Sequence, residues 1–103
     1  MSDPELSEAE KRARAIALLE ANHAFPTDYS ISVIARNDEA VQELVLGAAF
    51  AETGERPKDA HEILPSSGGK YVSHRLTIRC TDAEHVLRIY ARLGAIDGIL
   101  QIL

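Results

Sequence analysis

The ten residues PSSGGKYVSH, from Pro65 to His74, combine residue types that can hold an anion. Serine hydroxyls, glycine backbone N–H groups and a lysine ammonium together resemble a phosphate-binding nest. The residues of that nest are Ser66, Ser67, Gly68, Gly69 and Lys70. The spacing differs from a P-loop, in which G-x-x-x-x-G-K-[ST] joins a strand to a helix. Here the glycines stand between two strand-like runs, so we expect a hairpin whose glycines supply positive φ, and an anion site only second.

Three arginines and one tyrosine fall at the outward positions of two strand-like runs. Arg36, Arg75 and Arg79, together with Tyr71, predict a cationic polar surface on an acidic protein. Sheets that bind RNA carry aromatic residues on their two central strands. Only Tyr71 is available here, and the run K/R-G-F/Y-G/A-F-V-x-F/Y of those domains is missing. The pattern therefore favours a solvated face or an oligomer interface, with RNA binding as the alternative.

The histidines and the single cysteine are not arranged as metal ligands or catalytic residues. The histidines are His23, His61, His74 and His85. None stands at a metal-site spacing from another, and His74 and Cys80 lie on the apolar side of a strand pattern, which predicts core positions. No G-x-S-x-G elbow presents a nucleophile, and most acidic residues stand at helix starts, where they complement the helix dipole. We predict a protein that is not an enzyme and that binds no metal and no cofactor.

Length and composition set the class of protein. The chain has 103 residues, of which 46% are apolar, enough for one domain with a core that needs no disulfide or metal. One cysteine forms no intramolecular disulfide and fits a reducing, cytoplasmic setting. The N-terminus lacks the apolar segment of a signal peptide, and no apolar run is long enough to span a bilayer. The net charge of −5 disfavours whole-molecule attraction to nucleic acid or to anionic membranes.

A regular succession of helix and strand patterns positions these residues. Ser7 and Glu10 form a capping box before an Ala-rich and Leu-rich helix, and Thr81 with Glu84 forms a second one. The strongest strand pattern follows the glycines and alternates apolar residues with arginines. The expected helices are 8–21, from Asn37-Asp38 to about 52, and from the second capping box to Gly94. The expected strands are 29–36, 60–64, 70–80 and the run IDGILQIL at the C-terminal end.

The order of these elements predicts an α+β fold. A helix followed by β-α-β-β-α-β is typical of a ferredoxin-like βαββαβ sandwich, a four-stranded antiparallel sheet. Right-handed crossovers place two helices on one face and leave the other face open, with the strand order 4-1-3-2. Residues 1–24 are predicted as an N-terminal helical extension and residues 25–103 as the domain. The modest apolar stripe of the extension, with Ile16 and Leu19, favours docking onto the open face over a free helix.

Three pieces of the sequence, taken in order, resemble the YbeD-like family of small bacterial proteins. They are Phe25-Pro26 with Tyr29, then Pro65-Ser66-Ser67-x-Gly69-x-Tyr71-x-Ser73, then Leu93-Gly94-x-Ile96-Asp97 before a short hydrophobic strand. The resemblance covers about residues 25–103 and implies an ACT-like, ferredoxin-like fold without an established family function. ACT domains commonly bind small effectors, often amino acids, near the first strand–helix turn and at a dimer interface. That turn is Arg36-Asn37-Asp38-Glu39 here, and it lacks the glycine that ACT domains often carry.

We predict a non-catalytic, cytoplasmic regulatory or protein-interaction module that forms a homodimer or binds a partner enzyme. The one-sided sheet, an edge available for pairing and the missing catalytic constellation support this prediction. The alternatives are RNA binding on the open sheet face and, as in ACT domains, small-molecule sensing. The candidate binding residues are Ser66, Ser67, Lys70, Tyr71, Arg36, Arg75 and Arg79.

Overall fold

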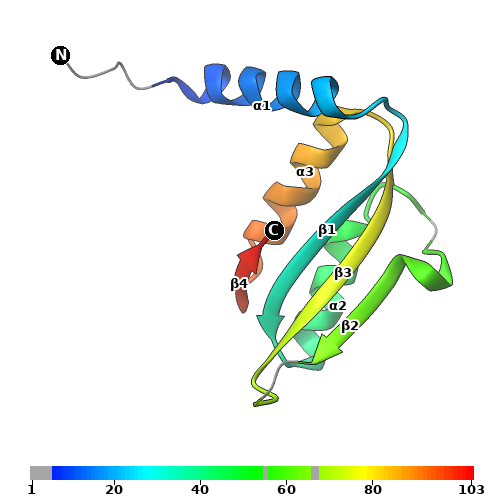
Figure 1. The fold of residues 1–103 in the computed structure, drawn as a ribbon. Coiled ribbons are helices and arrows are strands. Elements are labelled where there is room, and N and C mark those ends of the chain that lie inside the picture. The colour runs from blue at the N-terminus through cyan, green and yellow to red at the C-terminus, as the bar shows by residue number, and fades with distance from the viewer. Residues whose placement is uncertain (1–5, 55, 66–67) are drawn as a thin grey trace.

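The computed structural model describes residues 6–54, 56–65 and 68–103 (Figure 1). The described residues form the helix and the β-α-β-β-α-β succession predicted from the sequence, with one short 3-10 helix added. The elements are α1 (Glu8–Asn22), β1 (Thr27–Arg36), α2 (Glu39–Ala49), η1 (Lys58–Ala60), β2 (His61–Pro65), β3 (Tyr71–Cys80), α3 (Ala83–Gly94) and β4 (Ile99–Ile102). Within these ranges, no helix has the length and apolar character needed to cross a bilayer.

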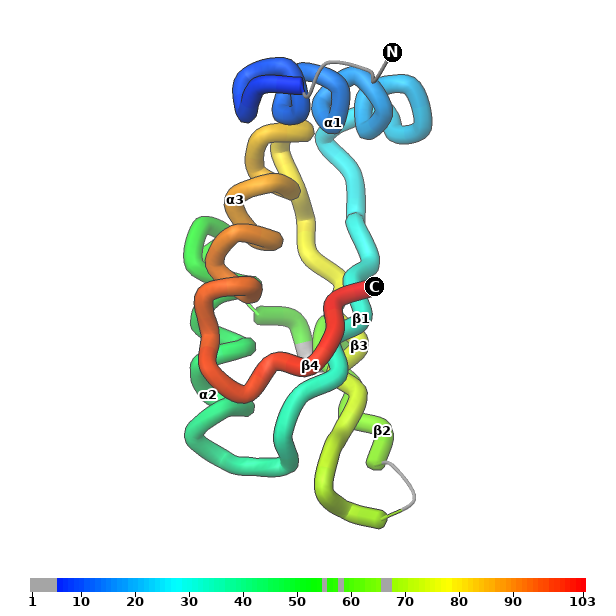
Figure 2. The backbone as a smooth tube through the Cα atoms, turned by 90° about the vertical axis from the view of Figure 1, so that its left-hand side faces the viewer, coloured from blue at the N-terminus to red at the C-terminus, as the bar shows by residue number. Residues whose placement is uncertain are grey.

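The strands form one antiparallel sheet in the order β2-β3-β1-β4, which is the predicted order read from the opposite edge. The central pair is aligned over ten residues, from Thr27 opposite Cys80 to Arg36 opposite Tyr71. α2 and α3 lie together on one side of the sheet, as Figure 2 shows in a view turned by 90°. The predicted α+β, ferredoxin-like arrangement with two helices on one face is therefore confirmed.

Alternation along the two central strands decides which of their side chains are buried. Ile31, Val33 and Ala35 of β1 are at most 1% exposed. The buried residues of β3 are Val72, His74, Leu76, Ile78 and Cys80. Because successive side chains of a strand point to opposite faces, the residues between them face away from the helices. The inward faces predicted from the sequence are confirmed on both strands.

A side-chain cap begins each of the described α-helices. At α1, Ser7 accepts a hydrogen bond from the backbone N–H of Glu10, as the capping box predicts. At α2, Asp38 accepts hydrogen bonds from two backbone N–H groups of the first turn. At α3 the cap is Asp82, whereas the sequence pattern had favoured Thr81. The helix begins one residue later than expected because an ionised carboxylate caps the positive end of the helix dipole well.

The N-terminal helix α1 lies across one end of the domain (Figure 1). It contacts α3, and Arg12 Nη2 lies 3.3 Å from Glu84 Oε2. Leu19 packs against the core, while Leu18 is 59% exposed. The helix therefore docks, but the expected docking onto the open sheet face is not what the structure shows. The apolar stripe of α1 is narrow, and the helix packs near the N-terminal end of α3.

The sheet is four strands wide at one end and two strands wide at the other. β2 pairs only with residues 72–76 of β3, and β4 pairs only with residues 33–35 of β1. Leu103 adds one further rung, in which it exchanges backbone hydrogen bonds of 2.7 and 3.2 Å with Ser32. Beyond it, β1 and β3 continue toward α1 (Figure 2). We call residues 27–30 of β1 and 77–80 of β3 the narrow end, and residues 31–36 and 71–76 with their neighbours the broad end.

Candidate functional site

The open face of the sheet brings four of the predicted site residues together. Arg36 lies on β1, and Tyr71, Arg75 and Arg79 lie on β3, all at positions that face away from the helices. The register sets Arg36 directly opposite Tyr71. Because Tyr71, Arg75 and Arg79 follow at intervals of four residues, the three arginines are spaced about 13 Å apart along the face.

Each of these arginines stands beside an acidic side chain. Arg79 Nη1 lies 3.6 Å from Asp28 Oδ1, and Arg36 Nε lies 3.7 Å from Asp38 Oδ2. Arg75, the arginine between these two, is opposite Glu62 in the register of β2 and β3. The open face is thus charge-balanced, which differs from the cationic surface expected from the arginines alone. Exposed pairs of this kind contribute little stability, but they set the charge that a partner meets.

Apolar side chains gather on the open face at the broad end. Leu64, Ser73 and Ile34 form one rung across three strands, and Leu64 and Ile34 are half-buried. Tyr71, one rung further along, is also half-buried. Leu103, on the rung of Ser32, is 61% exposed. The outward residues of the narrow end are all polar, namely Asp28, Ser30, Thr77 and Arg79.

The loop between β2 and β3 is held by a residue from another turn. Ser66 and Ser67 lie outside the described residues, so the predicted anion nest stays a prediction. Gly69 has a positive φ of 71°, as a hairpin turn requires, but the positive φ also expected of Gly68 is not found. The Asn37 side-chain amide donates to the Gly69 carbonyl at 2.8 Å, and the Asn37 backbone N–H donates to the Lys70 carbonyl at 3.0 Å. Asn37 therefore fastens the loop to the β1–α2 turn, while the Lys70 side chain is exposed.

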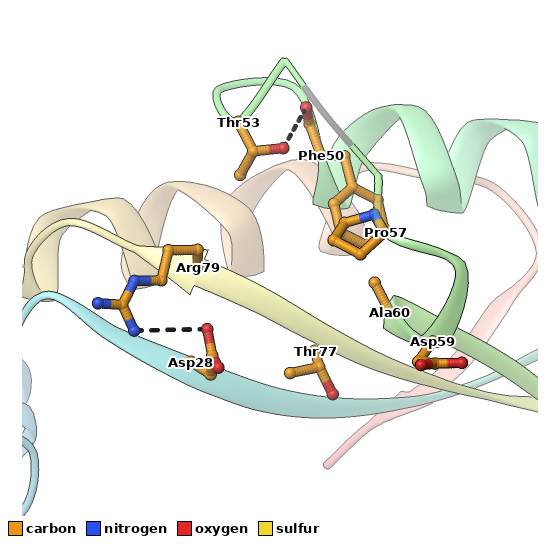
Figure 3. Close-up of a pocket in the computed structure, with 8 residues that line it drawn as sticks. All are labelled: Asp28, Phe50, Thr53, Pro57, Asp59, Ala60, Thr77 and Arg79. Atoms are coloured by element: carbon orange, nitrogen blue, oxygen red, sulfur yellow. Dashed lines mark hydrogen bonds and ion pairs between the residues drawn. The ribbon is translucent and has the colours of Figure 1, made fainter.

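A pocket of about 420 Å³ opens at the narrow end, beside the part of β3 that β2 leaves unpaired (Figure 3). Polar residues of β1 and β3 line one side, and the chain between α2 and β2 supplies the other lining residues. The lining residues are Asp28, Phe50, Thr53, Pro57, Asp59, Ala60, Thr77 and Arg79. The Asp28–Arg79 ion pair lies at its rim (Figure 3). Apolar walls with a few polar groups suit a small amphipathic molecule.

Two histidines, thirteen positions apart in the chain, meet on the helix side of β2 and β3. His61 Nε2 lies 2.9 Å from His74 Nδ1, and the two rings are stacked at 5.1 Å. Desolvation and then the neighbouring His61 lower the pKa of His74, and desolvation and then Arg56 lower the pKa of His61. The sequence predicted His74 as a core residue, which is confirmed, but it missed this pair. The register of β2 against β3 was the signal that would have found it.

Burial makes Cys80 chemically inert. Desolvation, with smaller contributions from nearby carboxylates, raises the pKa of the Cys80 thiol to about 11, so the thiol stays protonated at neutral pH. Its predicted position in the core is confirmed. Across the part of the chain that the structure describes, no three His, Cys, Asp or Glu side chains gather as metal ligands.

Comparisons with known proteins connect this chain to a bacterial family. The family described as protein of unknown function (DUF493) matches residues 20–103, so most of α1 lies outside the match. A UPF0250 protein of Hahella chejuensis is 32% identical over 79 residues, which are 77% of this chain and 87% of that protein. A UPF0250 protein of Paraburkholderia phymatum is 30% identical over 69 residues, 67% of this chain and 78% of that protein. The small bacterial family without established function that the sequence motifs implied is confirmed.

Proposed function

We propose, since the chain belongs to the DUF493 family of proteins of unknown function, that it is a non-catalytic, cytoplasmic regulatory or protein-interaction module. Residues 25–103 form the interacting domain, residues 1–24 are an extension, and another protein chain docks on the broad end of the open face. The observation that carries this proposal is the set Ile34, Leu64 and Tyr71 on a face that no described helix covers. Apolar side chains ringed by charged ones are the usual composition of a protein interface.

The dimensions of the broad end favour a reversible contact. Four strands spaced about 4.8 Å apart and five residues at about 3.3 Å each outline roughly 300 Å². A stable interface buries about 800 Å² on each partner, so this face alone supports a transient complex. A transient complex is what a regulatory module needs. The single cysteine is a buried free thiol, which supports the reducing setting of the cytoplasm.

The test compares matched charge insertions at the two ends of the open face. Ile34→Glu and Leu64→Glu place a carboxylate in the apolar set, and Thr77→Glu places one at the polar narrow end. Light scattering of the purified protein and its co-purification from cells measure self-association and partner binding. We expect the broad-end variants to weaken the complex at least about tenfold, because an unpaired charge is desolvated there, and Thr77→Glu to leave it unchanged. A protein that stays monomeric at high concentration and recovers no partner contradicts the proposal.

RNA binding on the same face is the alternative that charge balance disfavours. Its test is a salt titration with a single-stranded RNA oligonucleotide. We expect no saturable binding at low salt, since the arginines stand beside acidic groups. Binding whose salt slope falls by about one in Arg75→Ala would replace the interaction proposal with an RNA platform.

Small-molecule sensing is a second candidate function, favoured by the pocket at the narrow end. A thermal-shift screen of amino acids and cofactors tests it, because a ligand present at 100 times its Kd adds about 2.7 kcal/mol of stability. A true ligand of this pocket loses its shift in Phe50→Ala and keeps it in Leu64→Ala, because Leu64 lies toward the other end of β2 and does not line the pocket. A screen without hits removes this candidate and leaves the docking proposal untouched.

A further inference from the structure

The narrow end leaves one edge of β1 without a neighbouring strand. Ser32 exchanges both of its backbone hydrogen bonds with Leu103, which fixes the side of β1 toward which its N–H and C=O point. Because these groups alternate along a strand, Ser30 and Asp28 direct theirs to the same side. No described strand pairs with that side of β1 before Ser32, and both residues are exposed. Two N–H and two C=O groups therefore line an open lane along residues 27–31.

We propose that this lane binds an extended segment of another protein as an added strand. Five residues at about 3.3 Å each give a lane of roughly 17 Å, which ends at Leu103 on one side and at Pro26 on the other. An added strand continues the line of β4 and satisfies the four backbone groups, which is the mode of strand addition at an exposed sheet edge. The lane is a different surface from the broad end of the open face, so this inference does not rest on the proposed function.

The side chains beside the lane define the chemistry of the segment. On the helix side, the Tyr29 ring lies 5.1 Å from His23 and 6.4 Å from Tyr90, and both tyrosines are half-buried. On the open side, the Asp28 side chain is 67% exposed and pairs with Arg79 only at 3.6 Å. A segment that alternates apolar and basic residues matches both sides, and the net charge of −5 attracts it.

A second copy of β1 fits this lane poorly in every antiparallel register that aligns the free backbone groups. When two copies pair with Tyr29 opposite Tyr29, Pro26 of one copy lies opposite Ser32 of the other. Leu103 of that other copy already occupies this position, because it is hydrogen-bonded to Ser32. If the register is shifted so that Asp28 of one copy pairs with Asp28 of the other, the two carboxylates lie directly opposite each other, which is destabilising. A shift in the other direction sets Asp28 against Ser32, whose backbone is already bonded to Leu103. The occupant is therefore a segment of a different protein.

The first test uses a capped peptide, Lys-Val-Lys-Val-Lys-Val-Lys, and the isotope-labelled full chain. With its lysines on the open side, the lysine N–H groups face β1 and the valine N–H groups face away, because side-chain face and backbone direction alternate together. We expect saturable binding, with NMR shifts at the Asp28 and Ser30 amides. Methylation of the lysine backbone nitrogens should abolish binding, whereas methylation of the valine backbone nitrogens should leave it intact.

The second test changes the protein. Ser30→Pro removes a backbone donor that faces the lane and leaves the ladder with β3 intact, whereas Ser30→Ala keeps the donor. We expect Ser30→Pro to weaken peptide binding about tenfold and Ser30→Ala to leave it unchanged. If Ser30→Pro does not fold, the proposal is tested by comparing how tightly the two methylated peptides bind to the unaltered protein. No saturable binding up to millimolar peptide, equal binding of the two methylated peptides, or shifts confined to β2 or β4 would overturn the proposal.

Discussion

The two ends of the sheet expose different parts of the same two strands. At the broad end, β2 and β4 pair with the backbone of β1 and β3, so what remains for a partner is the side chains of the open face. At the narrow end no described strand flanks the central pair, which leaves backbone groups open along β1 and a pocket beside β3. The unequal strand lengths therefore give one small domain two kinds of exposed surface, one that offers side chains and one that offers backbone hydrogen-bonding groups.

The largest expected effect tests whether the narrow end is as firmly packed as the broad end. Ile78 lies at the narrow end and is fully buried, so Ile78→Ala should lower the free energy of unfolding by about 2–5 kcal/mol. Val72→Ala, at the broad end, removes less volume from a residue that is 6% exposed and should cost less. Urea unfolding monitored by circular dichroism measures both values.

Thr77→Ala is the matched control for Ile78→Ala, since it changes the next residue on the outward face. It should shift the free energy of unfolding by about 0.5 kcal/mol or less. A smaller loss for Ile78→Ala than for Val72→Ala would mean that the two-stranded part is loosely packed, and the comparison between the ends would fail.

A pH effect of intermediate size belongs to the broad end. Burial lowers the pKa of both His61 and His74 below their ordinary value of 6.5, so folding favours the neutral rings. The folded protein then binds fewer protons than the unfolded chain, and stability that is complete above pH 6.5 is lost as pH falls below it. Besides desolvation, the nearby charge of Arg56 lowers the pKa of His61, and the neighbouring His61 lowers the pKa of His74.

Urea midpoints measured between pH 8 and pH 5 check this sign, and they stop before most carboxylates titrate. His74→Leu should make the profile less steep, because it removes one of the two rings whose pKa is lowered by burial. His23→Gln is the matched control, because it changes a histidine outside the pair and leaves both stacked rings in place. A profile that is flat in the unaltered protein would show that the pair is hydrated in solution.

The smallest expected effect concerns the ion pairs that hold the chain after α2 against α3. Arg88 Nη2 lies 2.8 Å from Glu52 Oε1, and Arg92 Nη1 lies 2.8 Å from Glu52 Oε2. Hydrogen bonding from Arg88, despite some desolvation, lowers the pKa of Glu52 to about 2. Glu52→Gln should lower Tm by a few degrees at most at pH 7, since these pairs are partly exposed.

The sign of the Glu52 effect can also be checked with pH. A depressed folded-state pKa means that the stabilisation is present above the ordinary value of 4.5 and disappears as pH falls toward 2. The difference in Tm between Glu52→Gln and the unaltered protein should shrink over that interval. Glu43→Gln, on the exposed face of α2, is the control, because it removes a carboxylate and leaves both ion pairs of Glu52 in place.

The sequence predicted the features that depend on local pattern, such as the buried faces of the strands. It missed the features that depend on how the strands are aligned with one another. Alternation on β1 and β3 predicted their buried faces, and the β-α-β-β-α-β succession predicted the strand order. The His61–His74 pair and the unequal strand lengths depend on how far β2 and β4 extend, which is decided by tertiary contacts rather than by propensity. Asn37 shows the same limit, because a residue suited to capping α2 instead bonds to Gly69. The proposed residues Arg36, Arg75 and Arg79 were found by alternation, but their acidic neighbours needed the structure.

The long central ladder also governs how the chain folds. β2 and β3 are joined by a short loop, so their pairing closes quickly. The pairing of β1 with β3, from Arg36 with Tyr71 to Thr27 with Cys80, instead joins segments separated by α2 and η1. Because such distant pairing costs chain entropy before any contact repays it, we expect this ladder to limit the refolding rate, on a timescale of milliseconds to seconds. Substitutions in the β1–β3 ladder should slow refolding, whereas those in α1 should mainly speed unfolding.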